Sequence, residues 1–244
     1  MLHVTANDRY TIDALELGPM ANFVYVITDR KSGRTAVVDP AWEPEAILQL
    51  AKARETRISD ILLTHSHYDH INAVEPVLAA HDAELHLLKA EAAFWGEHPA
   101  RPTLHHGEDE IRLGATPIRI LHTPGHTPGS ACYLIDEFLI AGDTLFVWGC
   151  GRCDLDGGDP EQMYDSLRRL MQLPDTTLTL PGHDYSDRPT ATLAEQKEGN
   201  PFLHCPDREH FVEYRMHVHD RIRNDPYSAV HRGDPEDCGL AQPK

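Results

Sequence analysis

Four short hydrophobic runs in this chain each end at a residue type that binds metals. The runs cover residues 60–64, 118–121, 138–142 and 177–182, and they are followed by His65, His122, Asp143 and His183. In a layered α/β fold, strand ends can converge on one edge of a sheet, where loops on rigid supports commonly carry functional sites. We therefore expect the imidazoles and carboxylates at these strand ends to form a metal site.

The first of these runs leads into a dense motif, His65-x-His67-x-Asp69-His70. Two imidazoles two residues apart in an extended segment or tight loop can chelate one ion while the residue between them points away. Asp69 and His70 follow at a predicted helix start and would point elsewhere. They can serve a second ion about 3.5–4 Å from the first, as in two-metal hydrolytic sites.

The other three runs supply isolated candidates. His126 lies in a Thr-Pro-Gly-His-Thr-Pro-Gly turn, whose composition fixes the backbone on both sides. Asp143 is a candidate bridge because a carboxylate has two oxygens to share, and His183 would complete the second ion. His122 is interpreted as structural or as a support for a ligand. All donors are N and O, which suits zinc, iron or manganese. The other histidines are interpreted as ordinary surface or core residues: His81, His86, His98, His105, His106 and those near the C-terminus.

The spacing of apolar and turn residues predicts an interleaved order of strands and helices. Strands are predicted over residues 10–17, 22–28, 35–38, 61–63, 84–88 and 177–180, with hairpins within 111–121 and 130–141. Helices are predicted over residues 43–53, 73–80, 160–173, 191–198 and 209–223. This order fits an α/β fold of two sheets packed face to face with helices outside, an αββα sandwich. Residues 1–185 are predicted to form the catalytic domain, and residues 186–244 an extension packed on it with an irregular tail from Asn224.

Composition narrows the choice of partners and compartment. The formal net charge of −17 argues against a nucleic-acid partner, which would need Lys and Arg to neutralise phosphates. No apolar run approaches the roughly 20 residues that span a bilayer, and the start lacks the pattern of a secretory signal. Five cysteines, an odd number, fit a reduced compartment better than a disulfide framework. We therefore expect a cytoplasmic protein without a membrane partner. The Cys150-x-x-Cys153 pair is assigned to a loop on the substrate side.

Taken together, the HxHxDH motif, His126, Asp143 and His183 resemble the metallo-β-lactamase superfamily over about residues 22–185. The resemblance implies the αββα sandwich, with a hydroxide between two ions as the nucleophile. It assigns His65, His67 and His126 to the first metal. It assigns Asp69, His70 and His183 to the second, with Asp143 as the bridge. Asp69 and Asp143 are the carboxylates expected to act in catalysis, Asp69 by orienting the hydroxide. Metal-bound water reaches a pKa of about 7, so the implied chemistry agrees with the residues.

Within that superfamily, several segments are similar to glyoxalase II, the hydroxyacylglutathione hydrolases. They are residues 142–146, 149–152, 181–185, 192–196 and 200–203. The resemblance implies hydrolysis of a glutathione thioester with two divalent ions, zinc or otherwise iron or manganese. It also implies that Arg152 and Tyr185 contact the glutathione part of this small thiol-derived substrate.

Two departures favour a second branch, the persulfide dioxygenases. Only residues 186–189 separate Tyr185 from Thr190, where long glyoxalase II enzymes carry a helical segment. The loop over residues 151–158 is also longer and resembles that of the dioxygenases. Such an enzyme would hold a single Fe(II) with His65, His126 and Asp143, the two-histidine, one-carboxylate set of oxygen-activating iron. Tyr68 favours glyoxalase II. A non-enzymatic metal-binding relative is the third alternative, and the complete ligand set argues against it.

Overall fold

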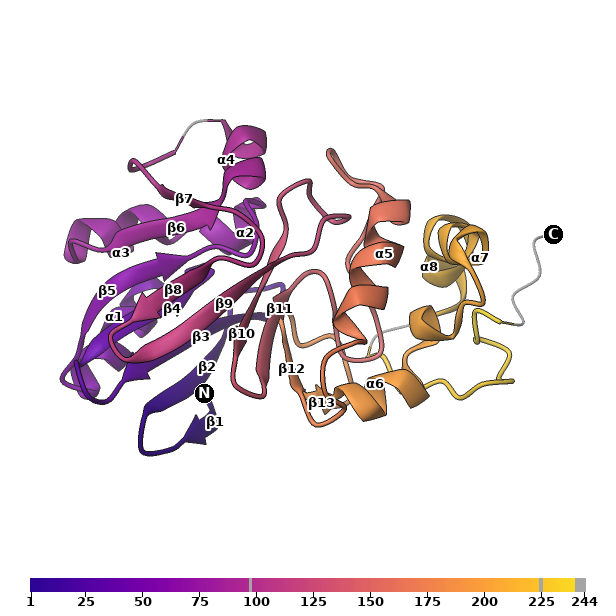
Figure 1. Cartoon of the computed structure of the whole chain (residues 1–244), viewed down its shortest axis with the longest axis horizontal. Helices are drawn as coiled ribbons and strands as arrows, with labels where there is room; N and C mark the ends of the chain where they lie inside the picture. Colours follow the sequence, from indigo (N-terminus) through magenta and orange to yellow (C-terminus); the bar gives the residue numbers. More distant parts are fainter. Residues whose placement is uncertain (97, 224–225, 240–244) are drawn as a thin grey trace. The chain divides into compact units, whose positions relative to one another are not determined.

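The chain forms two compact units in a computed structural model that describes residues 1–96, 98–223 and 226–239 (Figure 1). The first unit comprises Met1–Leu121 and the second His122–Lys244. This division falls inside the predicted catalytic domain. The predicted boundary at residue 185 therefore stays a prediction.

A seven-stranded sheet forms the centre of the first unit, with its strands side by side in chain order. The strands are β1 (Leu2–Ala6), β2 (Tyr10–Leu17), β3 (Asn22–Asp29), β4 (Arg34–Val38), β5 (Arg57–Leu62), β6 (Glu84–Leu88) and β7 (Thr103–His105). Strands β1 to β4 pair antiparallel, and β4 to β7 pair parallel. Because parallel strands all end at the same edge, the segments after β4 and β5 emerge together there.

Helices α1 (Pro44–Ala53) and α3 (Val74–Ala80) pack on this sheet, and α2 (Tyr68–Ile71) and α4 (Lys89–Trp95) complete the unit (Figure 1). Apolar residues of α1 recur at helical spacing, so Ile47 and Leu50 point to the same side. They join Val77 of α3 and the sheet residues Ile61 and Leu85 in one buried cluster. Burial of this apolar stripe holds the crossover helices on the sheet and so fixes where the strand ends emerge.

A hairpin of β8 (Glu110–Leu113) and β9 (Thr116–His122) is fastened to the turn after β3. Asp29 accepts hydrogen bonds from the Ala115 amide at 3.2 Å and the Thr116 hydroxyl at 2.8 Å. Gly114 has φ +61°, and a Cβ there would lie 2.1 Å from the Ser32 hydroxyl oxygen. Burial acts to raise the pKa of Asp29, but hydrogen bonds from Ser32 and Thr116 hold it below its usual value.

The second unit contains strands β10 (Ala131–Ile135), β11 (Phe138–Gly142), β12 (Leu178–Pro181) and β13 (Ala191–Thr192), with helix α5 (Pro160–Leu170). Strands β11 and β12 pair parallel, with Gly142 opposite Pro181. Asp143 and His183 therefore follow strands that end side by side. Helix α5 begins at Asp159, whose carboxylate accepts hydrogen bonds from two backbone amides of the first turn, a strong N-cap.

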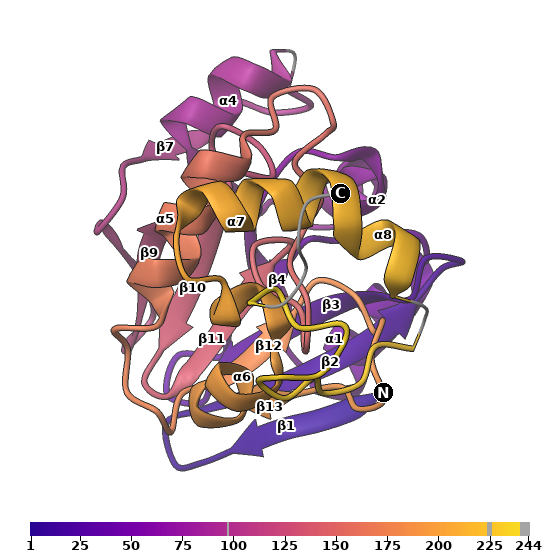
Figure 2. The ribbon, with the colours of Figure 1, turned by 90° about the vertical axis from the view of Figure 1, so that its right-hand side faces the viewer.

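The C-terminal helices belong to the second unit and follow one another as in Figure 2. They are α6 (Leu193–Gly199), η1 (Pro201–His204), α7 (Arg208–Glu213), the π-helical turn η2 (Tyr214–Val218) and α8 (His219–Ile222). The helix predicted over 209–223 is present as α7, η2 and α8, and one side of it is buried. Phe211, Tyr214 and His219 are buried, with their rings against or near Phe202. The predicted irregular tail is described only in part, since residues 224–225 and 240–244 lie outside the described residues.

The elements β1, β7, α4, β13 and η1 were not predicted, and residues 191–192, predicted as the start of a helix, form β13. Each is short, and β1 and β7 lie at the two edges of the first sheet. Edge strands bury less apolar surface, so their alternation pattern is weak. The other predicted elements are present, with ends shifted by a few residues.

The expectation that the cysteines are all reduced is wrong for one pair. Cys205 and Cys238 form a disulfide, while Cys132, Cys150 and Cys153 are free and buried. The C-terminal segment returns to the end of η1 through this disulfide and to η2, where the Tyr214 hydroxyl donates to the Glu236 carbonyl at 2.7 Å. A cysteine count cannot reveal this return of the chain. Burial raises the pKa of Cys150 to about 12, so this thiol stays protonated at neutral pH.

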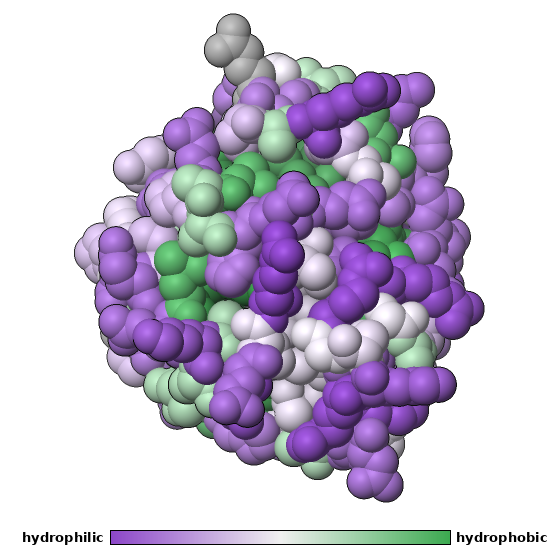
Figure 3. Space-filling view, turned by 90° about the vertical axis from the view of Figure 1, so that its left-hand side faces the viewer, coloured by the Kyte–Doolittle hydropathy of each residue, from purple (hydrophilic) through white to green (hydrophobic). Residues whose placement is uncertain are grey.

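One face of the molecule is mainly hydrophilic. Hydrophilic side chains cover most of the face drawn in Figure 3, with smaller apolar areas between them. No helix within the described residues is long and apolar enough to cross a membrane.

Replacing both Cys205 and Cys238 with serine should lower the free energy of unfolding by about 3–4 kcal/mol, because the bond restricts the unfolded chain. The loop that it closes has a sequence separation of 33. Urea denaturation of the oxidised wild type and the double variant measures the difference. A reductant should lower the midpoint of the wild type and leave the variant unchanged. Equal midpoints for oxidised and reduced wild type would contradict this.

Candidate metal centre

The HxHxDH segment gathers four ligand-type side chains at the carboxyl end of β5. His65 and His70 are each 1% exposed, and their ring centroids lie 4.1 Å apart. His65 and His67 lie 4.8 Å apart with nearly perpendicular rings. Asp69 Oδ2 is 3.4 Å from His70 Nε2. Helix α2 starts inside the motif, so Asp69 and His70 leave the extended path of the first two histidines, as predicted.

Asp39 organises this half of the centre from the end of β4. Its carboxylate accepts hydrogen bonds from the Thr64 amide at 2.7 Å, the Thr64 hydroxyl at 2.5 Å and His70 Nδ1 at 3.0 Å. The Thr64 hydroxyl donates its hydrogen bond to Asp39, so the Thr64 hydroxyl oxygen accepts a hydrogen bond from His65 Nδ1 at 3.0 Å. Both imidazoles therefore carry their proton on Nδ1. The lone pair is on Nε2, the tautomer that metal-binding histidines commonly adopt through such partners.

Two further contacts hold the motif. Asn22 donates through Nδ2 to Asp69 Oδ2 and to the Asp69 carbonyl, both at 3.0 Å, and accepts from Trp42 Nε1 at 2.7 Å. The buried carboxylate of Glu91 in α4 accepts from both the amide and the hydroxyl of Ser66, at 2.7 and 2.6 Å. The residue between the two histidines is thus tied to α4, away from the imidazoles.

The second unit gathers the other three ligand-type residues. Asp143 Oδ2 lies 3.6 Å from His126 Nε2 and 3.4 Å from His183 Nε2. All three side chains are buried or nearly so. A carboxylate oxygen between two imidazole nitrogens is a donor set suited to a divalent cation.

The loop that contains Gly151 and Arg152 orients the His126 side chain. His126 Nδ1 donates to the Arg152 carbonyl at 2.7 Å, which again leaves the lone pair on Nε2. A Cβ at Gly151 would lie 2.0 Å from the Asp143 carbonyl oxygen and 3.1 Å from His126 Cγ. Gly125 has φ +138° and lies against the Met163 backbone. Only glycine fits at these two positions, so the backbone closes tightly around the ligands.

The two predicted substrate contacts have different surroundings. The Arg152 side chain is 58% exposed and pairs with Asp154 through Nε at 2.9 Å and Nη2 at 2.7 Å. This pairing holds the pKa of Asp154 at about 2. The Tyr185 ring stacks on His183, with centroids 4.6 Å apart and 11° between planes. Tyr185 thus supports a ligand-type residue, and contact of either residue with a substrate stays a prediction. His122 Nε2 contacts the Pro128 carbonyl at 2.9 Å, in keeping with the structural interpretation.

The family model described as the metallo-beta-lactamase superfamily matches residues 17–183. This chain belongs to that superfamily. The fold class is therefore the predicted one, a mixed α/β fold with two sheets flanked by helices and short C-terminal helices.

This chain is similar to three known proteins, among others. A probable polyketide biosynthesis zinc-dependent hydrolase, BaeB of Bacillus velezensis, is 33% identical over 80% of this chain and 87% of its own. A hydroxyacylglutathione hydrolase of Fuscovulum blasticum is 39% identical over 75% of this chain and 70% of its own. The crystal structure of ETHE1 from Myxococcus xanthus has a TM-score of 0.78 and 31% identity, covering 85% of this chain and 90% of that one.

The residues present fit a metal of this superfamily. Within each unit the donors are imidazole nitrogens and carboxylate oxygens, and three of the imidazoles have Nδ1 engaged by an orienting group. Sequence reasoning missed those orienting groups, namely Asp39, Thr64, Asn22 and the Arg152 carbonyl. Asp39 could have been found, because it directly follows a buried strand, like the predicted ligands. Asn22 lies at a strand start and gives no such signal.

Asp39→Asn should reduce zinc affinity about 10–100-fold, the usual effect of losing a partner that orients a ligand. Asp39 has φ +52°, which asparagine tolerates well, so the backbone should be kept. Competition with a chromophoric chelator measures the affinity. The matched control is Asp82→Asn at an exposed position. Equal affinities for both variants would remove Asp39 from the centre.

Proposed function

We propose that this chain is a metal-dependent hydrolase of thioesters of the glutathione type. The observation that carries the proposal is the complete set of seven ligand-type residues, gathered in two half-sites in which three buried imidazoles are oriented through Nδ1. Membership of the superfamily and similarity to hydroxyacylglutathione hydrolases support it. The similarity to a probable zinc-dependent hydrolase supports zinc as the metal.

The proposed reaction uses two divalent ions. His65, His67 and His126 hold one ion. Asp69, His70 and His183 hold the other, and Asp143 is shared between them. Zinc suits these donors, and iron or manganese would be accepted by the same set. When bound, such ions lower the pKa of a water molecule to about 7 and polarise a carbonyl, the two contributions that hydrolysis requires at neutral pH.

The chain's own carboxylates have separate tasks in this proposal. Asp143 Oδ2 lies near both His126 and His183, which suits a shared ligand. Asn22 holds Asp69 Oδ2, so Asp69 can accept a hydrogen bond from the attacking water and keep it aimed at the carbonyl carbon. A thiolate is a good leaving group, and the proposal therefore needs no strong general acid.

The substrate side of the proposal rests on Arg152 and Tyr185. The guanidinium of Arg152 is a planar fork that matches a carboxylate, such as those of glutathione. The backbone carbonyl of Arg152 accepts a hydrogen bond from His126, so the loop that carries Arg152 lies next to a proposed metal ligand. Tyr185 stacks on His183 and would place its ring beside the same centre.

A persulfide dioxygenase is the second candidate function. In this reading a single Fe(II) is held by His65, His126 and Asp143, and the substrate is glutathione persulfide. The structural similarity to ETHE1, at 31% identity, and the long loop over residues 151–158 favour it. The ligand residues serve both candidates equally, so metal content and reaction must separate them.

Metal analysis of the protein as isolated, paired with two assays, tests the proposal. We expect two ions per chain and hydrolysis of S-lactoylglutathione, which is measured as the appearance of the free thiol. One iron per chain with oxygen uptake on glutathione persulfide, and no thioester hydrolysis, would overturn it in favour of the dioxygenase. Loss of both activities in a fully loaded protein would reject both candidates.

Arg152→Ala should raise KM for the glutathione thioester about 10- to 150-fold and change kcat little, since it removes a charge-assisted contact worth about 1.5–3 kcal/mol. Steady-state kinetics measures both constants. Arg208→Ala is the matched control, because Arg208 is similarly exposed and pairs with Asp165 in the same way. An unchanged KM in Arg152→Ala would exclude the side chain from the substrate site.

A further inference from the structure

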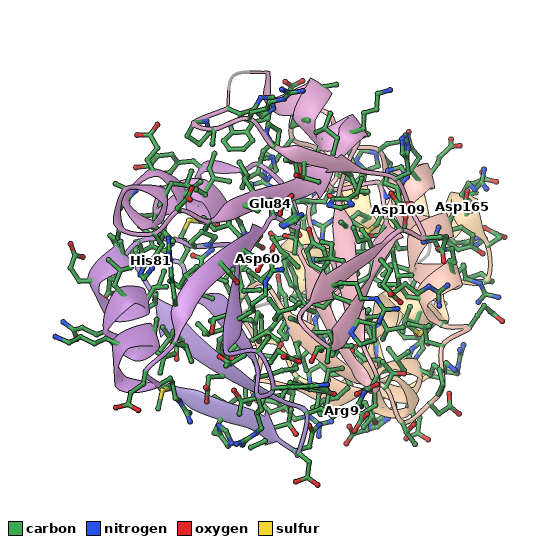
Figure 4. The ribbon with its side chains drawn as sticks, turned by 60° about the vertical axis from the view of Figure 1, so that its left-hand side comes forward. Arg9, Asp60, His81, Glu84, Asp109 and Asp165 are labelled. Atoms are coloured by element: carbon green, nitrogen blue, oxygen red, sulfur yellow. A yellow bond between two sulfur atoms is a disulfide. The ribbon has the colours of Figure 1, made fainter. Side chains whose placement is uncertain are left out.

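A second cluster of metal-ligating side chains lies on the parallel half of the first sheet. Asp60 of β5 is directly opposite Glu84 of β6, and His86 follows two residues later, so all three project from one face. His86 is in turn opposite Thr103 of β7, with His105 two residues further along. Figure 4 labels Asp60 and Glu84 on these neighbouring strands. None of these residues belongs to the HxHxDH segment or the second-unit half-site.

We propose that Asp60, Glu84 and His86 form a further site for a divalent transition-metal ion such as Zn²⁺. Asp60, Glu84 and His86 each offer one ligand atom, and these three atoms lie within 4.8 Å of one another. His86 Nε2 is 3.2 Å from Asp60 Oδ1 and 3.9 Å from Glu84 Oε2. Ligands about 2.0–2.1 Å from a tetrahedral ion are about 3.3–3.5 Å apart. Small movements of the side chains would therefore close the three donors around an ion.

Each proposed ligand also makes hydrogen bonds to neighbouring side chains. Asp60 Oδ2 accepts from the Ser59 hydroxyl at 2.5 Å, and Arg34 Nη2 donates to both carboxylate oxygens of Asp60, at 2.8 Å to Oδ1 and 2.9 Å to Oδ2. An ion on Oδ1 would therefore share that oxygen with Arg34. Glu84 Oε1 accepts from the Thr103 hydroxyl at 2.5 Å, and His86 Nδ1 lies 3.0 Å from His105 Nε2. Hydrogen-bond partners that orient ligands in this way are typical of metal sites.

The histidine pair suits this arrangement. With an ion on its Nε2, His86 carries its proton on Nδ1 and donates it to His105 Nε2. His105 accepts this hydrogen bond through its Nε2. Without an ion, His86 adopts the tautomer with its proton on Nε2 and donates a hydrogen bond to Asp60 instead. The same side chains therefore form either a metal site or a hydrogen-bonded network.

Burial and charge define the kind of site. Asp60 and His86 are 1% and 4% exposed, so these two ligands are rigidly held. Glu84 is 51% exposed in its side chain and gives an ion a route from solvent. Arg34 offsets one of the two carboxylate charges, which leaves a net charge of about −1 for a divalent cation. One nitrogen and two oxygens, with water as the fourth ligand, suit zinc or a similar ion.

The test counts zinc ions in full-length protein that has been stripped with a chelator, reloaded with ZnCl₂ and dialysed. Glu84→Gln should bind one zinc per chain fewer than the wild type. It should also show a smaller rise of Tm on zinc addition. The matched control is Glu110→Gln on the exposed side of β8, which should bind the wild-type number. The thioesterase rate of Glu84→Gln should equal that of the wild type, since Glu84 is not among the residues proposed to hold the catalytic ions.

His86→Gln provides a second variant, and circular dichroism shows whether it folds. If it unfolds, Glu84→Gln alone decides, because an exposed Glu-to-Gln change keeps the side-chain shape. Equal zinc numbers in wild type and Glu84→Gln would overturn the site and leave only the hydrogen-bonded network. The difference between the two counts does not depend on how many ions the proposed catalytic centre holds. Failure of that centre and failure of this site are thus distinguishable.

Discussion

The carboxylate of Asp39 is the interaction on which the first half of the metal centre depends. A buried charge is costly unless hydrogen bonds replace its lost water, and here Thr64 and His70 supply three of them. The same bonds determine the tautomers of His65 and His70. One buried group thus couples the end of β4 to the loop after β5. The positive φ of Asp39 turns the chain there so that its side chain can reach both.

The second unit reaches a similar arrangement by other means. A backbone carbonyl, that of Arg152, orients His126 in place of a carboxylate. The Tyr185 ring packs flat on His183, and the Phe146 ring meets it edge-on. A neutral carbonyl makes an imidazole less electron-rich than a carboxylate partner does, so the two units present donors of unequal basicity.

Much of this organisation could be predicted from the sequence. The residues that follow β11 and β12 lie together because parallel strands share an edge, and the HxHxDH segment turns into α2 where expected. The partners of the ligands were harder to find. Asn22 reaches Asp69 across a sequence separation of 47, which no local pattern records. The disulfide between Cys205 and Cys238 depends on the path of the C-terminal segment. The interpretation of His86 as an ordinary core residue could not anticipate Asp60 and Glu84, since only strand register brings the three together.

Gly151 constrains the position of the loop over residues 151–158. Its missing side chain lets the loop lie directly on the Asp143 carbonyl and the His126 ring, between two buried cysteines. The segment proposed to determine substrate specificity therefore also orients His126, a proposed metal ligand. Engineering that reshapes the loop to accept a new thiol would alter the aim of His126 at the same time. Sequence diversity is better introduced at residues 154–156, where the chain is exposed.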